Sequence, residues 1–203
     1  MTIIRYLVVP FKPHAGPATG RSDFRVAGCT LNQSLLLCLA GALLCGACIK
    51  PFTGPWDMRE LGQAPAFEWA DKTGPVKSLY YANEPYQGRT TRVFAYYAAP
   101  SEAEGKVPGM VLVHGGGGKA FAEWAELWAK RGYAAIAMDL AGCGPDDQRL
   151  PNGGPNQGHE QKFADFAKGV KEAWSYHAVA AVARAHSLLR SMPEVDPDRT
   201  GIT

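Results

Sequence analysis

The sequence predicts one α/β domain, built from an N-terminal hairpin followed by parallel strands with helices on both faces. The chain has 203 residues, of which 46% are apolar and 20% are charged, and this is an ordinary globular composition with room for one domain. Two runs rich in aromatic and β-branched residues lie on either side of residue 88, and a strand–helix–strand pattern covers residues 110–139. These observations indicate an α/β sheet that starts antiparallel and continues parallel.

Residues 1–48 are expected to be a leader that precedes the fold. The run SLLLCLAGALLCGAC, whose apolar region spans 34–47, contains only apolar and small residues and follows two arginines. It is shorter than the roughly 20 residues of a membrane span and suits a signal peptide. Its ending resembles a bacterial lipoprotein cleavage site, which would make Cys48 the lipidated residue. Ordinary cleavage after Ala47 and an uncleaved anchor remain alternatives. We therefore expect an exported protein that is periplasmic, anchored to the cell envelope by a lipid, or extracellular.

The next segment, residues 49–75, is expected to be a Pro/Gly-rich tether or surface lead-in. Prolines and glycines recur throughout it, and both discourage a helix or a central strand. The domain proper is then expected over residues 76–203. It begins with the runs VKSLYYANEPY and TTRVFAYYAAP, which are separated by QGR and have the composition of an antiparallel hairpin.

A β-α-β unit is expected from Met110 to Asp139. Met110–Val113 is a short continuous apolar run, as expected for a parallel strand that is buried on both faces. From Lys119 to Arg131, apolar residues recur at i, i+3, i+4 and i+7 and indicate an amphipathic helix that Gly132 ends. The run YAAIAMD then predicts a second buried strand.

The remaining elements are a long loop, a long helix and the beginning of another strand. Ala141–Lys162 contains five glycines and three prolines, which predicts an irregular segment. Phe163–Ser191 is expected to be helical with a break near Gly169, and the final TGIT has the pattern of a strand.

The run HGGGG at residues 114–118 lies between a strand and a helix and allows two interpretations. Gly115, Gly117 and Ala120 fit G-x-G-x-x-A, and Asp139 ends the next strand, as in a dinucleotide-binding module. The alternative is an oxyanion hole, because glycines let backbone N–H groups approach a negative oxygen closely. In α/β-hydrolases, H-G-G-G often follows the third strand, and here the glycines follow the third expected strand.

Two further segments resemble the α/β-hydrolase superfamily, in the branch of acetylxylan esterases, dienelactone hydrolases and prolyl-oligopeptidase-type hydrolases. These are RGYAAIAMDLAGCG and the tail that starts at WSYH and ends at TGIT, and the resemblance covers about Arg92 to Thr203. It implies the α/β-hydrolase fold. It also implies a set of site residues, namely Gly116 and Gly117 as oxyanion-hole donors, His114 and Gly115 as support for that loop, and Asp139 as a structural aspartate. His177 and His186 are expected to be packed or rim histidines without a catalytic role.

The resemblance also implies that the nucleophile lies just after Thr203. None of the seven serines stands in G-x-S-x-G, and in this superfamily the acid and the histidine of the triad follow the serine along the chain. The chain is therefore expected to be the N-terminal part of an α/β-hydrolase, truncated before the nucleophile elbow and inactive by itself. We also expect the strand that begins at TGIT to be cut off, which would leave Met110–His114 with an incomplete neighbour.

The expected function is that of a fragment of a secreted or lipid-anchored serine carboxylic-ester hydrolase, similar to acetylxylan esterases, with a small-molecule or carbohydrate ester as substrate of the full-length parent. No metal and no cofactor are expected. Ser34–Thr203 holds 17 basic and 18 acidic residues, so charge gives no reason to expect nucleic acid as a partner. Membrane contact is expected only through the signal or lipid anchor. A peptidase of the prolyl-oligopeptidase-like branch is the alternative within the superfamily. A dinucleotide-binding module and a non-catalytic remnant are the alternatives of a different class.

Overall fold

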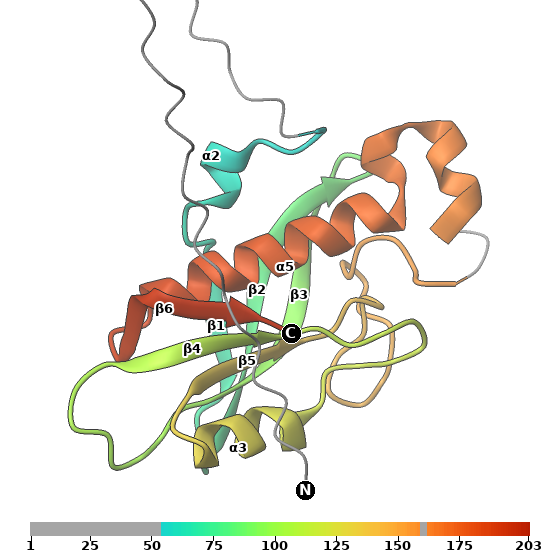
Figure 1. Cartoon of the computed structure of the whole chain (residues 1–203). Coiled ribbons are helices and arrows are strands. Elements are labelled where there is room, and N and C mark those ends of the chain that lie inside the picture. Colours follow the sequence, from blue (N-terminus) through green and yellow to red (C-terminus); the bar gives the residue numbers. More distant parts are fainter. Residues whose placement is uncertain (1–53, 159–161) are drawn as a thin grey trace, which may run out of the picture. The chain divides into compact units, whose positions relative to one another are not determined.

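A mixed six-stranded sheet organises the fold, and the computed structural model describes residues 54–158 and 162–203 (Figure 1). The strands are β1 (Phe67–Asp71), β2 (Val76–Tyr86), β3 (Arg89–Ala98), β4 (Val107–Leu112), β5 (Ala134–Met138) and β6 (Val195–Ile202). Their order across the sheet is β1-β2-β3-β5-β4-β6. β1, β2, β3 and β5 pair antiparallel, whereas β4 is parallel to both β5 and β6. The predicted α/β fold, antiparallel at its start and parallel afterwards, is confirmed.

The predicted hairpin is formed by β2 and β3. Tyr86 pairs with Arg89, so only Gln87 and Gly88 make the turn. Both of these residues have positive φ angles, as two-residue hairpin turns of this hand require. On the inner face of the hairpin, Tyr81 and Tyr97 are almost completely buried.

Residues 54–75, the described part of the expected tether, belong to the domain. They contain the single-turn helix α2 (Met58–Leu61) and the edge strand β1, and Leu61 is buried in the domain. A boundary at residue 76 is therefore wrong, because the described part of this segment belongs to the same compact unit as the residues up to Thr203. The prolines flank β1 rather than interrupt it, and an edge strand needs hydrogen bonds on one side only. The expected leader, with its apolar region 34–47 and Cys48, lies outside the described residues.

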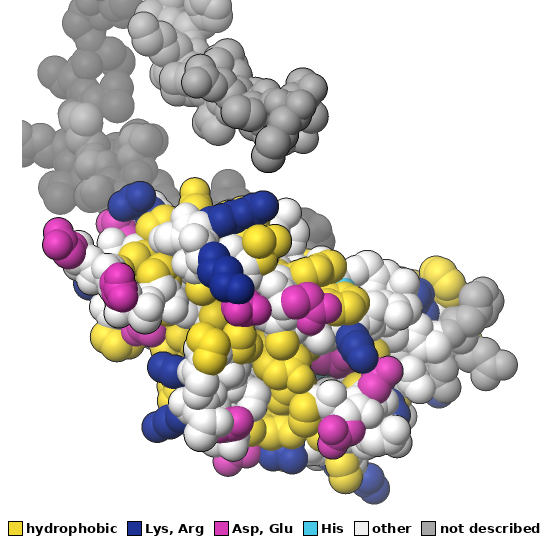
Figure 2. Space-filling model, turned by 90° about the horizontal axis from the view of Figure 1, so that it is seen from below, with side chains coloured by type: hydrophobic (Ala, Val, Ile, Leu, Met, Phe, Trp, Pro, Cys, Tyr) yellow, Lys and Arg dark blue, Asp and Glu magenta, His cyan; other side chains and the backbone are white. Residues whose placement is uncertain are grey.

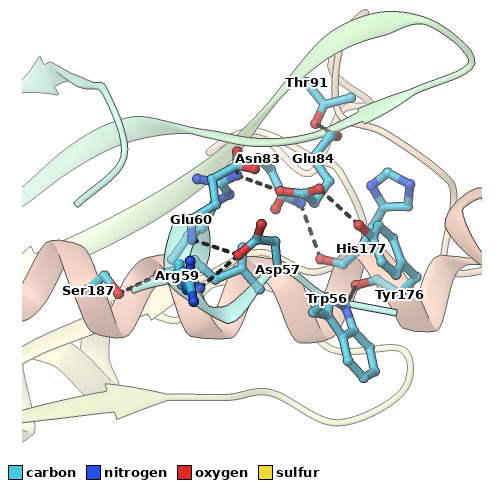
Figure 3. A network of polar contacts seen from close by, with 12 residues as sticks. Trp56, Asp57, Arg59, Glu60, Asn83, Glu84, Thr91, Tyr176, His177 and Ser187 are labelled. Carbon is cyan, nitrogen blue, oxygen red and sulfur yellow. Dashed lines mark hydrogen bonds and ion pairs between the residues drawn. The ribbon is translucent and has the colours of Figure 1, made fainter. Parts of the chain in front are cut away.

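Polar contacts fix this lead-in to α5 (Trp174–Ser191), as Figure 3 shows. The Trp56 ring stacks on Tyr176 with centroids 5.8 Å apart, and its Nε1–H donates to the Tyr176 carbonyl over 3.0 Å. Arg184 lies between two carboxylates, at 2.8 Å from Glu60 and 2.5 Å from Glu84. The lead-in is thus held to α5 by stacking, a hydrogen bond and an ion pair, and the same arginine also binds β2.

Helices cover the parallel part of the sheet on both faces. Successive residues of β5 point to opposite faces: Ala135 and Ala137 share a core cluster with Ala125 of α3 (Ala122–Lys130), whereas Ile136 and Met138 belong to the cluster beneath α5. All five residues of β5 are buried, as the uninterrupted apolar pattern predicts for a central parallel strand. The predicted β-α-β unit is therefore confirmed.

The long helix is broken as predicted, but its residues 164–172 are not α-helical. Two 3₁₀ segments, η1 (Ala164–Lys168) and η2 (Val170–Glu172), precede α5. Gly169 separates them, with φ 130° and ψ 150°, which no helix contains. The preceding segment is irregular throughout residues 141–158, in agreement with its glycine and proline content.

The last strand is longer than the final TGIT indicates. β6 pairs with β4 from Val107 to Val111, with an irregularity at Pro108, which has no N–H to donate. The Thr203 N–H and carbonyl also bond to Val111 and Val113. The expectation that β4 lacks a complete neighbour is wrong, since β4 is flanked by β5 and β6. None of the described helices is both long enough and apolar enough to cross a bilayer.

Candidate functional site

The candidate site is the glycine loop, Gly115–Gly118, which follows the carboxyl end of β4. Gly115, Gly116 and Gly117 are exposed. In open α/β sheets, ligands bind outside the carboxyl ends of the parallel strands. The glycine loop therefore lies where backbone groups of such a fold can contact a ligand.

His114 holds this loop to the end of β5. Its ring is only 4% exposed, and its Nε2 accepts the Leu140 N–H over 2.8 Å. The proton then resides on Nδ1, which donates to the Gly115 carbonyl oxygen over 2.8 Å. Because both ring nitrogens are occupied, His114 connects two loops and has no nitrogen available to act as a base.

The four glycines hold a tight turn, and their N–H groups differ in what they bind. The Gly118 N–H donates to the Gly115 carbonyl over 3.0 Å. The Gly117 N–H donates to the Oε1 of Gln157, a buried side chain, over 3.3 Å. The Gly116 N–H donates to no described residue. Of the two predicted oxyanion donors, Gly116 is thus the one whose N–H is open to a ligand.

Two side chains from the long loop lie at the glycine loop and were not foreseen from the sequence. One is Gln157, and the other is Lys162, whose Nζ lies 3.6 Å from the position that a Cβ on Gly116 would take. They are about forty residues away along the chain, and no local pattern links them to the glycines. Only the tertiary fold brings them together.

Asp139 is buried and accepts a hydrogen bond from the backbone of the following loop. It is 2% exposed, and its Oδ1 accepts the Cys143 N–H over 2.7 Å. Burial raises the pKa of Asp139 above its ordinary value, although the N–H groups of the loop work against this. A dinucleotide-binding module needs this carboxylate at a ribose hydroxyl. A side chain enclosed in this way cannot reach one, which weighs against that alternative.

The two helical histidines make structural contacts. His177 is buried, its Nε2 lies 2.8 Å from the Lys171 carbonyl oxygen, and burial lowers its pKa. His186 has its Nε2 2.8 Å from the Thr200 hydroxyl, and burial followed by the charge of Arg190 lowers its pKa. Neither histidine is bonded to a serine. His159 lies outside the described residues.

The described residues contain no serine–histidine pair. Two of the helical serines donate to backbone carbonyls, Ser187 to Leu61 over 2.6 Å and Ser191 to Leu188 over 2.7 Å. Within residues 54–158 and 162–203 there is also no group of three or more His, Cys, Asp or Glu side chains that could hold a metal ion.

Two apolar hollows lie at the carboxyl ends of β4 and β6, one on each face of the sheet. The larger has a volume of about 680 Å³ and lies between α5 and the end of β6, where Val179, Val182 and Ile202 line it. The smaller, of about 300 Å³, is lined by Trp124 and Leu127 of α3. Figure 2 views the molecule from the side on which α3 lies, and hydrophobic side chains gather in the middle of that face.

Comparisons with known proteins agree on one family and one fold. The profile of a family described as acetyl xylan esterase (AXE1) matches residues 56–203. Among solved structures, the acetyl xylan esterase of a Paenibacillus species matches with 21% identity and a TM-score of 0.51, over 72% of this chain and 48% of that chain. Acetyl Xylan Esterase 1 of a Thermoanaerobacterium species matches with 19% identity and a TM-score of 0.51, over 73% of this chain and 50% of that chain. The chain thus spans about half the length of these structures, which share its fold. No curated protein sequence matches it.

Proposed function

Because the chain belongs to the acetyl xylan esterase (AXE1) family, we propose that it supplies the oxyanion-binding part of a serine carboxylic-ester hydrolase. The observation that carries this proposal is the open Gly116 N–H, which lies at the carboxyl end of a central parallel strand in a loop that His114 fixes. Backbone donors that are held rigid before the reaction are the groups that stabilise a developing oxyanion most effectively.

The reaction in the proposed enzyme is acyl transfer to a serine. The hydroxyl attacks the ester carbonyl, the carbonyl oxygen becomes negative and accepts the Gly116 N–H, and the alcohol leaves to give an acyl-enzyme that water hydrolyses. The Gly117 N–H becomes a second donor once the Gln157 amide oxygen moves away from it. The described residues hold no serine–histidine pair, so we place the nucleophile, its base and the acid after Thr203 in a longer protein.

The proposed substrates are acetyl esters of carbohydrates or small molecules. This substrate class is what the name of the matched family indicates, and the pocket that selects the acyl group and the alcohol would come mostly from the second half of the protein. On this proposal the 203-residue chain is inactive alone, because oxyanion donors without a positioned nucleophile do not produce an acyl-enzyme.

The test first reads the genomic DNA past the codon for Thr203. If coding sequence is found there, the longer version that includes it is compared with the 203-residue chain. We expect only the longer version to hydrolyse 4-nitrophenyl acetate above background and to form an acyl-serine that mass spectrometry detects. A longer version that folds but has no esterase activity would reject the proposal. Turnover by the 203-residue chain alone would place a nucleophile among its own residues.

We also propose that the protein is exported and carries a lipid on Cys48. The support is the apolar run at residues 34–47 with small residues before the cysteine. Deletion of residues 34–48 is expected to leave the protein in the cytoplasm. A labelled fatty acid is expected to be incorporated into the wild type and not into Cys48→Ala, and equal labelling of both would exclude lipidation at this residue.

A further inference from the structure

A positive charge lies beside the open donor of the glycine loop. The Nζ of Lys162 is 3.6 Å from the position that a Cβ on Gly116 would take. In any residue, the Cβ lies about 2.5 Å from the backbone nitrogen of the same residue. The ammonium is therefore within about 6 Å of the Gly116 nitrogen. An acceptor placed between the two nitrogens can form a charge-assisted hydrogen bond of about 2.8 Å to each, and these two bonds together nearly span the separation. The two groups are thus close enough for one small anion to reach both.

A chain of contacts links Lys162 to the glycine loop. Its Nζ lies 5.1 Å from the centroid of the Trp174 ring, a distance typical of a cation–π contact. The Trp174 Nε1–H donates to the Leu140 carbonyl over 2.7 Å, and the Leu140 N–H donates to His114, which in turn bonds to Gly115. The ammonium and the glycine loop are therefore fixed to the same structural elements.

Among the described residues, no carboxylate neutralises the charge of Lys162. Lys162 forms no ion pair with any described carboxylate, whereas Lys168 and Lys130 pair with Asp165 and Glu126 at 2.7 and 2.6 Å. An ammonium that rests on an aromatic ring, beside a backbone N–H without a described partner, has the composition of an anion site. A carboxylate fits it, because its two oxygens can accept from the two donors separately.

We propose that Lys162 Nζ and the Gly116 N–H form a binding site for small carboxylates. The inference rests on the proposed function in one respect. If the protein is part of an acetyl esterase, acetate is the product that the enzyme releases, so it is the natural ligand of this site and inhibits the hydrolysis that forms it. The ammonium also adds to the stabilisation of the oxyanion at Gly116. The binding itself is a property of this chain and requires no turnover.

The test is a titration of the full 203-residue chain with sodium acetate, followed by the ¹⁵N–¹H chemical shift of the Gly116 amide, at an ionic strength kept constant with sodium chloride. We expect a saturable shift in the wild type and an affinity lower by about tenfold or more in Lys162→Gln. Lys162→Arg keeps the charge and is expected to retain binding. The matched control is Lys119→Gln, an exposed lysine next to the loop, which is expected to bind acetate as the wild type does.

Three outcomes would overturn the inference. These are the absence of a saturable acetate shift in the folded chain, equal affinity in Lys162→Gln, and equal competition by chloride, which would mean that no carboxylate is recognised. The result is distinct from the esterase test. Acetate binding together with an inactive longer protein would keep this site and reject the proposed function, whereas an active esterase without acetate binding would do the reverse.

Discussion

The four glycines of the loop are identical in the sequence and unequal in the structure. Gly117 has φ +77°, a conformation that other residues rarely adopt, and a Cβ there would meet nothing within 4 Å. A Cβ on Gly118 would come within 2.9 Å of the His114 Nδ1. Gly115 has neither restriction. The sequence predicts a close approach of backbone at this loop, but only the backbone angles and neighbours distinguish the role of each glycine.

This difference predicts unequal effects of alanine at Gly117 and Gly115. Gly117→Ala forces a side chain into the left-handed region and is expected to lower the free energy of unfolding by about 1–2 kcal/mol. Gly115→Ala is the matched control, and its effect is expected to stay within about 0.5 kcal/mol. Urea unfolding followed by circular dichroism measures both. Equal effects of the two substitutions would show that the loop does not hold its left-handed turn in solution.

At the level of elements, the ion pairs between the lead-in, β2 and α5 make stability depend on pH. The side chains of Glu84 and Arg184 are 14% and 10% exposed. Burial alone would raise the pKa of Glu84, but hydrogen bonds from Arg184 and Tyr176 and the guanidinium charge outweigh it, and the pKa lies below the ordinary value of 4.5. A carboxyl with a lowered pKa in the folded state stabilises the fold above its unfolded pKa, and this contribution is lost as the pH falls through its folded pKa.

We therefore expect Glu84→Gln to lower the melting temperature at pH 7 and to reduce its dependence on pH below about 4.5. The melting temperatures of the variant and the wild type should approach each other as the pH falls. Glu68→Gln is the control, since Glu68 is 67% exposed and its ion pair with Arg92 lies in water, where such pairs contribute little. If the melting temperatures of wild type and Glu84→Gln differed by the same amount at every pH in this range, the lowered pKa of Glu84 would be contradicted.

Some elements could be predicted from the sequence because their patterns are local. The aromatic and β-branched composition of β2 and β3, the spacing of apolar residues in α3 and the uninterrupted apolar run of β5 can each be read from one short stretch of sequence. The composition of the lead-in indicates a tether because it is rich in proline and glycine, whereas its fold depends on the contacts of Trp56 and Glu60 with α5. The positions of Gln157 and Lys162 at the glycine loop are tertiary as well, and no spacing in the sequence encodes them.

For the whole molecule, the two apolar hollows at the ends of β4 and β6 are the surfaces that favour self-association. Val179 and Ile202 are 47% and 54% exposed beside the larger hollow. An apolar surface of this kind at the edge of a sheet favours association. We expect the 203-residue chain to self-associate as its concentration rises, and light scattering after size-exclusion chromatography measures this.

The substitution Val179→Lys is expected to shift the chain toward the monomer, because it places a charge at the larger hollow. Val170→Lys is the matched control, since Val170 is 41% exposed and lies on η2, away from both hollows. A wild type that stays monomeric at every concentration would contradict the prediction, and so would an equal effect of the two lysines.

The central claim is that the Gly116 N–H stabilises an oxyanion, and the most direct measurement compares two substitutions there in the version that continues past Thr203. Gly116→Pro removes the N–H, whereas Gly116→Ala keeps it and places a Cβ at an ordinary contact distance of 3.6 Å from the Lys162 ammonium. If both variants melt like the wild type, we predict that kcat/KM for 4-nitrophenyl acetate falls about 100- to 1,000-fold in Gly116→Pro and changes little in Gly116→Ala. A folded Gly116→Pro variant that keeps wild-type turnover would contradict the account.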